Sequence, residues 1–92
     1  MLKLWIRLIR DNKLTGQFTA PVKAASAADM LAEGLREGCY ELDLAQPMVQ
    51  EKHLKDIRQY GFTRFLPESF MEDVSFDRME VRIFDDKQKN KK

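Results

Sequence analysis

The sequence contains one cysteine, three prolines and four glycines among 92 residues, and it has no long apolar run. A single cysteine excludes an internal disulfide framework and a zinc site built from several cysteines. No stretch approaches the roughly 18 apolar residues that a membrane-spanning helix requires. Charged residues at positions 3, 7 and 10 interrupt the apolar N-terminus, so we expect no secretory signal peptide. These absences predict a cytoplasmic protein with no membrane partner.

Signatures of catalysis and of metal or phosphate binding are missing too. The chain has no glycine-rich phosphate loop, no His-Glu-x-x-His zinc motif and no Gly-x-Ser-x-Gly nucleophile motif. Two pairs of neighbouring acids, at 72–73 and 85–86, lack the spacing and the glycine of a calcium loop. We therefore expect no cofactor, no metal site and no enzymatic activity.

The composition is that of an ordinary folded domain, with 43% hydrophobic and 34% charged residues, and the length allows one modest core. The net charge of +1 is unevenly placed, because the last six residues hold four lysines and no acid. Residues 1–86 therefore contain 12 basic and 15 acidic residues, a net charge of −3. We expect a single α+β domain over 1–86 and a disordered, lysine-rich tail at 87–92.

Strand patterns occur in two pairs along the chain. Residues 2–10 alternate between apolar and mixed positions, with the period of two that is typical of a half-buried strand. A second strand over about 14–22 follows a short turn and is expected to pair with the first as an antiparallel hairpin. Residues 62–66 and 79–84 are also expected to be strands, with a turn at 67–69 and an irregular stretch through residue 77 between them.

The first of two predicted helices begins at Ser26, because Ser26 and Asp29 have the spacing of a helix-capping box. The helix is expected to run to about residue 42. Its glycines, Gly34 and Gly38, each cost about 1 kcal/mol relative to alanine in a helix interior. A close approach of this helix to the sheet would offset that cost.

The second predicted helix starts near Pro47, which suits a first helical turn, and ends before Gly61, a natural C-terminal cap. The order of elements is then β-β-α-α-β-β. Two helices between two pairs of strands predict a two-layer α+β fold, with a mainly antiparallel four-stranded sheet and both helices on one face.

Cys39 and His53 are the only cysteine and the only histidine, and the two helices could bring them together as a thiolate–imidazole pair. Cysteine beside a buried helical stripe usually behaves as a small apolar side chain, however. His53 also lies among apolar residues, where a packed, hydrogen-bonded histidine is the commoner outcome. Nothing in the sequence supplies an oxyanion site, so we expect no catalytic role for either residue.

The sheet face turned away from the helices is the candidate interaction site. If the apolar positions of the first and last strands contact the helices, five other side chains point outward: Trp5, Arg7, Ile9, Arg82 and Phe84. Because Trp and Arg are enriched at interface hot spots, we expect a protein partner or a second copy of the chain at this face.

Two alternatives for this face remain open. Aromatic and basic side chains on a sheet also bind single-stranded nucleic acid, although the acidic domain makes that partner less favourable. The segment 67–77, which contains Phe70, Met71 and Phe76, could instead fold over the face and turn it into a second core.

Arg64 stands between two phenylalanines in the third predicted strand. Its guanidinium could be presented to an anion or a base. An arginine in a half-buried strand more often packs its alkyl chain on a ring and pairs with a carboxylate, so we expect an ion pair with Glu68 or Glu72.

Four short stretches are distinctive: LWIRLIRD at 4–11, CYELDLA at 39–45, TRF at 63–65 and FDRMEV at 76–81. Together they resemble a family of small uncharacterised bacterial proteins of about this length. The resemblance covers nearly the whole expected domain. It implies a free-standing protein rather than a fragment, and it assigns no catalytic or binding residue.

Overall fold

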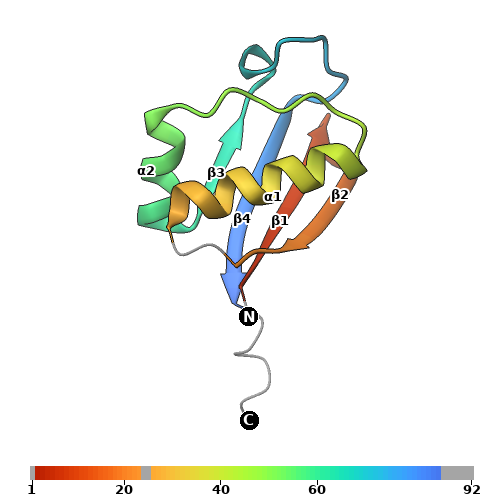
Figure 1. Ribbon diagram of the computed structural model, residues 1–92. Coiled ribbons are helices and arrows are strands. Elements are labelled where there is room, and N and C mark those ends of the chain that lie inside the picture. Colours follow the sequence, from red (N-terminus) through yellow and green to blue (C-terminus); the bar gives the residue numbers. More distant parts are fainter. Residues whose placement is uncertain (1, 24–25, 86–92) are drawn as a thin grey trace.

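The computed structural model describes residues 2–23 and 26–85 as one sheet and two helices (Figure 1). The elements follow in the order β1 (Leu2–Arg10), β2 (Lys13–Pro21), α1 (Ala27–Glu41), α2 (Glu51–Tyr60), β3 (Phe62–Phe65), the 3-10 helix η1 (Pro67–Ser69) and β4 (Arg78–Asp85). The tail predicted at 87–92, and residue 86 of the predicted domain, lie outside the described residues.

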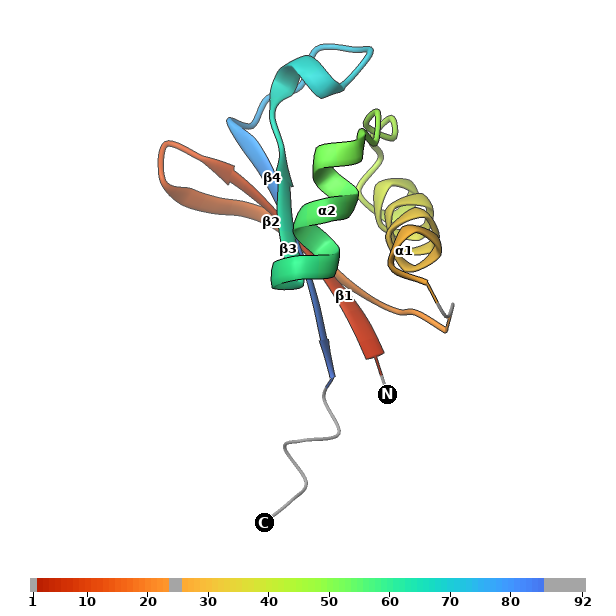
Figure 2. The ribbon, with the colours of Figure 1, turned by 90° about the vertical axis from the view of Figure 1, so that its left-hand side faces the viewer.

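The four strands form one antiparallel sheet in the order β2-β1-β4-β3. Both helices cover the same face of it (Figure 2). The prediction of an α+β fold with a four-stranded antiparallel sheet and two helices is therefore confirmed. The turn predicted at 67–69 is a 3-10 helix, η1.

The core lies between the sheet and the helices, because alternate side chains of the two central strands point towards the helical layer. Leu4 and Ile6 of β1 and Val81 of β4 are 0% exposed. Helix α1 contributes Leu31 and Leu35 to the same cluster. The period of two in the strands and the apolar stripe of the helix thus meet in one core.

Helix α1 approaches the sheet closely at its two glycines, as predicted. Its N-terminus is capped by Ser26, whose side chain accepts a hydrogen bond from the backbone N–H of Asp29 at 3.1 Å. A Cβ atom added at Gly34 would lie 2.8 Å from the methyl carbons of Leu4, and one at Gly38 would clash with Cδ1 of Ile6. Larger residues here would push the helix off the sheet.

The hairpin between β1 and β2 contains a β-bulge. Leu8 lies opposite Gly16, whereas the next residue, Ile9, lies opposite Leu14. Thr15 is therefore an extra residue in β2, and its hydroxyl donates a hydrogen bond to the carbonyl oxygen of Leu8 at 3.2 Å. The bulge changes which side chains of β2 face the helices.

Helix α2 begins later than predicted, since Pro47 is buried in the preceding connection rather than in the first turn. Its first residue is Glu51, and the backbone N–H of the N-cap residue Gln50 donates to Nδ1 of His53 at 2.9 Å. This capping bond, rather than the fixed φ of the proline, sets where the helix starts. Gly61, with φ 69°, ends the helix as expected.

Candidate functional site

The sheet face away from the helices receives side chains from all four strands, and we call it the outer face. Its residues by register are Gln17 and Thr19 of β2, Lys3, Trp5, Arg7 and Ile9 of β1, Arg78, Glu80, Arg82 and Phe84 of β4, and Phe62 and Arg64 of β3. The strand periodicity predicted this placement for the five candidate residues, and all five belong to the face.

The segment between β3 and β4 does not turn the outer face into a second core. Phe70 and Phe76 are buried in the cluster on the helical side, where their rings contact each other edge-to-face with centroids 5.3 Å apart. The segment projects from one end of the sheet (Figure 2). The alternative in which its aromatic residues cover Trp5 is therefore wrong, because those rings close the end of the helix-side core.

Ile9 is the one candidate whose expected exposure is wrong, since only 7% of it is exposed. It lies where the bulge brings Leu14 opposite it, with Arg78 as its register partner on β4. Its carbonyl oxygen also accepts a hydrogen bond from the backbone N–H of Asp77 at 2.7 Å. Ile9 therefore contributes little to the accessible surface of the outer face.

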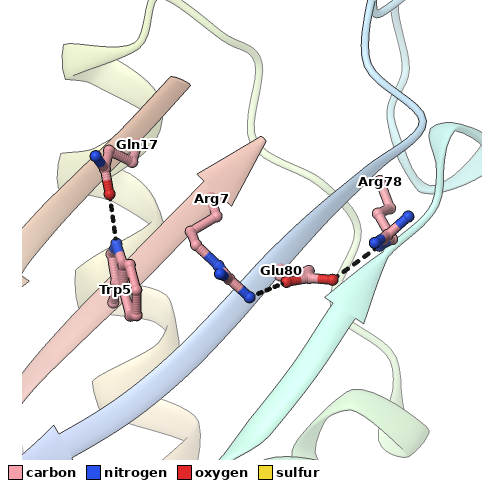
Figure 3. A network of polar contacts seen from close by, with 5 residues as sticks. All are labelled: Trp5, Arg7, Gln17, Arg78 and Glu80. Carbon is pink, nitrogen blue, oxygen red and sulfur yellow. Dashed lines mark hydrogen bonds and ion pairs between the residues drawn. The ribbon is translucent and has the colours of Figure 1, made fainter. Parts of the chain in front are cut away.

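Trp5 is fixed in place by a polar neighbour on β2 and by another on its own strand, β1 (Figure 3). Its indole Nε1–H donates to Oε1 of Gln17 at 3.0 Å. The guanidinium carbon of Arg7 lies 4.8 Å from the centre of the indole ring, a distance typical of a cation–π contact. Trp5 is thus a half-buried, oriented ring rather than a freely rotating one.

Glu80 links two arginines of the outer face (Figure 3). Its carboxylate accepts hydrogen bonds from Nη2 of Arg7 and, at 2.8 Å, from Nε of Arg78. Burial by itself would raise the pKa of Glu80, but the hydrogen bonds and charges of Arg78 and Arg7 together hold it below its usual value. The carboxylate is therefore charged at neutral pH and fixes the arginine that covers Trp5.

Positive charge is concentrated on the outer face. Its register positions hold five basic residues and one acid: Lys3, Arg7, Arg64, Arg78, Arg82 and Glu80. Arg82 is exposed and lies over Phe62, with its guanidinium carbon 5.2 Å from the ring centre. It forms no ion pair with any described residue. The face thus has an excess of four positive charges and a cation open to solvent.

Arg64 does not form the ion pair that we expected with Glu68 or Glu72. Its side chain is exposed at the edge strand β3, and none of the residues in 2–23 and 26–85 pairs with it. Arg64 lies opposite Glu80 in the strand register, but the Glu80 carboxylate already forms ion pairs with Arg7 and Arg78. The expected pairing is wrong, and the exposed Arg64 side chain lies at the edge of the sheet, where it also lines the hollow beside His53.

An open hollow of about 440 Å³ lies on the outer face. It is lined by Trp5, Gln17, Thr19, Arg82 and Phe84. Its volume falls within the range of roughly 300–1,000 Å³ that is typical of ligand-binding clefts. Three of the five predicted residues line the hollow, and Arg7 lies beside it against the indole. Sequence reasoning missed Gln17 and Thr19, although the alternation of apolar residues at 18, 20 and 22 with polar residues at 17 and 19 could have assigned both to the outer side.

Cys39 and His53 do not form a catalytic pair in a shared cleft. Cys39 is 1% exposed, and burial raises the pKa of its thiol from 9.0 to about 11, so the thiol is protonated near neutral pH. It lines a hollow beside Asp43 and Glu72, whereas His53 lines a different hollow at the start of α2. Neither geometry nor ionisation supports a thiolate–imidazole nucleophile here.

The surroundings of His53 are those of a packed residue that helps to stabilise the fold. It is 2% exposed, and its ring packs against Phe65 with centroids 4.2 Å apart. Burial lowers the pKa of His53, and the charge of Lys52 lowers it further against the smaller opposite effect of Asp56. The adjoining hollow of about 510 Å³ mixes basic and acidic side chains, among them Lys52, Asp56, Arg64 and Glu68. No single charge sign dominates it, so the outer face is the stronger candidate site.

Comparison with protein-family models, with curated proteins and with solved structures found no match for this chain. In the described part of the chain, no three histidine, cysteine or acidic side chains gather in a way that could hold a metal ion. No helix formed by the described residues has the length and apolar character to span a membrane. The family resemblance inferred from the four short stretches stays a prediction.

Proposed function

We propose that this protein binds single-stranded nucleic acid through the outer face of its sheet. The observation that carries the proposal is the five-to-one excess of basic over acidic residues around an oriented tryptophan. Phosphates attract such a face, and base rings stack on aromatic side chains whatever their sequence. Arg82 and Arg64 supply guanidiniums that are not neutralised by carboxylates of the described residues.

The excess of basic residues on the outer face also favours nucleic acid over self-association. The sequence alone had favoured self-association or a protein partner. A two-fold dimer through the outer face would place five basic residues and one acid of each copy against the same set in the other. Like charges brought together in this way oppose association. The phosphates of a single-stranded nucleic acid would instead neutralise the positive charge of the outer face. A protein partner at this face would have to be acidic.

The proposal is tested by titrating the protein with fluorescently labelled single-stranded DNA and RNA oligonucleotides of about eight nucleotides. Three to five phosphate contacts should weaken binding by roughly 20- to 100-fold when salt is raised from about 50 to about 200 mM. The comparison shows which type of strand the outer face prefers. Absence of binding to both, or binding that salt leaves unchanged, would overturn the proposal.

Arg82→Ala is the matched variant for this test, because Arg82 is exposed and carries an unpaired charge on the outer face. It should weaken binding about tenfold and reduce the salt slope by about 0.7, the value of one single-strand phosphate contact. Arg36→Ala removes the same charge from the exposed side of α1 and should leave binding unchanged. Equal losses in the two variants would show that binding is not located on the outer face.

A further inference from the structure

We infer that the hollow at the start of α2 binds a small zwitterion with an apolar side chain, as found in a free apolar amino acid or dipeptide. This hollow of about 510 Å³, which we call the α2 hollow, has one wall from residues 48–56 and the other from residues 64–69. It is separate from the hollow beside Trp5. The inference goes beyond the proposed function and does not depend on it.

His53 presents a hydrogen-bond donor to the α2 hollow. Its Nδ1 accepts from the backbone N–H of Gln50 at 2.9 Å, so the proton of the neutral ring is on Nε2. Nε2 has no hydrogen-bond partner among the described residues. No buried polar side-chain atom of those residues lacks a partner, so Nε2 belongs to the 2% of His53 that stays exposed. Because His53 lines the hollow, this N–H is open to a ligand there.

The charged side chains of the α2 hollow balance to zero. They are Lys52, Asp56, Arg64 and Glu68. Within the part of the chain that the structure describes, none of the four forms an ion pair. A multiply charged anion would meet as many acids as bases here, whereas a ligand with one charge of each sign can pair with both kinds. The charge balance therefore favours a zwitterion over a phosphate or a nucleic-acid strand.

The two ends of such a ligand have different partners in the α2 hollow. A carboxylate can accept from Nε2 of His53 at the start of α2, where Lys52 and the helix dipole also attract negative charge. Of the two acids, Asp56 already accepts a hydrogen bond from Thr63 at 3.2 Å. Glu68 has no hydrogen bond or ion pair with a described residue, so it is the acceptor for the ammonium group.

The apolar part of the ligand would contact Met48 and Leu66, one from each wall of the α2 hollow. These side chains are 54% and 39% exposed, so a ligand that covers them removes apolar surface from water. The backbone N–H of Met48 donates to the carbonyl oxygen of Ser69 at 2.8 Å, which joins the two walls. The apolar surface is therefore present before a ligand arrives, and an apolar zwitterion should bind more tightly than a polar one.

The experiment titrates the protein with L-leucine and with leucyl-leucine and follows the imidazole nitrogens by ¹⁵N NMR. His53 is the only histidine, so the chain gives one set of imidazole signals. Binding should shift the Nε2 signal saturably and leave the tautomer unchanged. The tighter ligand shows whether the site takes an amino acid or a dipeptide. The absence of a saturable shift with either ligand up to about 10 mM would overturn the inference.

Analogues of leucine test whether both charges are needed. Isocaproate lacks the amino group and isoamylamine lacks the carboxyl group, and each should bind about tenfold more weakly than leucine. Glycine keeps both charges without the apolar side chain and should also bind more weakly. If isocaproate binds as tightly as leucine, the site accepts carboxylates in general and the assignment of a zwitterion is wrong.

Glu68→Gln removes the carboxylate assigned to the ammonium group and should weaken leucine binding about five- to tenfold. Glu72→Gln is the matched control, because Glu72 is also exposed but lies outside the α2 hollow. Equal binding of leucine by the two variants would show that the ligand does not occupy the α2 hollow. Neither residue belongs to the outer face, so nucleic-acid binding should be the same in both.

Discussion

At the scale of single residues, His53 closes the N-terminus of α2 through a ring nitrogen that carries no proton. Nδ1 can accept the hydrogen bond from the N–H of Gln50 only while the imidazole is neutral, with its proton on Nε2. A protonated ring would lose this bond and place a positive charge at a helix N-terminus. Burial and the charge of Lys52 act in the same direction on the pKa.

We therefore expect the free energy of unfolding to decrease as the pH falls from about 6.5 to about 5. The pKa of His53 is lowered in the folded protein, so the unfolded chain takes up a proton first in this interval. The contribution is complete above the ordinary pKa and is lost as the pH falls towards the lowered one. Urea denaturation at several pH values measures this dependence.

His53→Gln is the control, because glutamine keeps an oxygen acceptor that does not titrate. Since the chain has no other histidine, its free energy of unfolding should change much less over the same pH interval. A wild-type profile as flat as that of the variant would show that His53 is not held neutral by the cap.

At the scale of elements, the contact between α1 and β1 depends on the absence of side chains at two helical positions. Gly38→Ala should gain up to about 1 kcal/mol in helix propensity but lose about 1–3 kcal/mol by overpacking, because its Cβ would meet Cδ1 of Ile6. The expected result is a net loss of stability of about 1–2 kcal/mol, measured by chemical denaturation.

Ile6→Val removes the methyl group that the new Cβ would strike, at a cost of about 0.5–1.5 kcal/mol by itself. In that background Gly38→Ala should be much less destabilising than in the wild type. If the two substitutions are simply additive, the tight contact seen between the helix and the strand does not limit this position.

The β1–β2 hairpin illustrates how far the sequence predicted the fold and the site. The alternation in residues 2–10 predicted which side chains of β1 face outward, because a half-buried strand leaves a clear period of two. Pairing counted back from the turn without a bulge would place Phe18 opposite Trp5 and Gln17 opposite Ile6. The extra residue at position 15 reverses these faces, since a shift of one residue exchanges the two sides of a strand.

The hollow was not predicted, although Trp5, Arg82 and Phe84 were assigned to the outer side and the alternation of apolar and polar residues over 17–22 would also have placed Gln17 and Thr19 there. The bulge itself, with Thr15 as the extra residue, could not be located from the sequence, because a bulge of one residue leaves the alternation within each strand unchanged. The start of α2 was mispredicted through a similar local effect. A histidine side chain caps the helix, and histidine is not among the preferred capping residues.

At the scale of the whole molecule, charge is unevenly distributed between the outer face and the rest of the described chain. The outer face has five basic residues and one acid, whereas the rest of the described chain has seven basic and thirteen acidic residues. The net charge of residues 1–86 is negative and therefore gave no sign of a basic face. For that reason the sequence alone favoured a nucleic-acid partner less than the structure does. Counting charged residues along the sequence does not show which of them the fold gathers on one face.

Because of this polarity, we expect the protein to be a monomer by light scattering at tens of micromolar. Two outer faces repel each other, and this repulsion is strongest at low salt, where the measurement is made. Arg82→Glu should remain monomeric as well. A dimer that Arg82→Glu dissociates would instead favour association through the outer face and count against the proposed function.

The two strands at the centre of the sheet come from opposite ends of the described chain, since Leu2 is paired with Asp85. Until β4 has been synthesised, β1 lacks its central neighbour and β3 has no strand to pair with. The sheet therefore cannot close until β4, the last strand of the described chain, has been synthesised. During synthesis, the apolar side of the β1–β2 hairpin would depend on α1 for cover, and a ribosome pausing before β4 would prolong its exposure to aggregation.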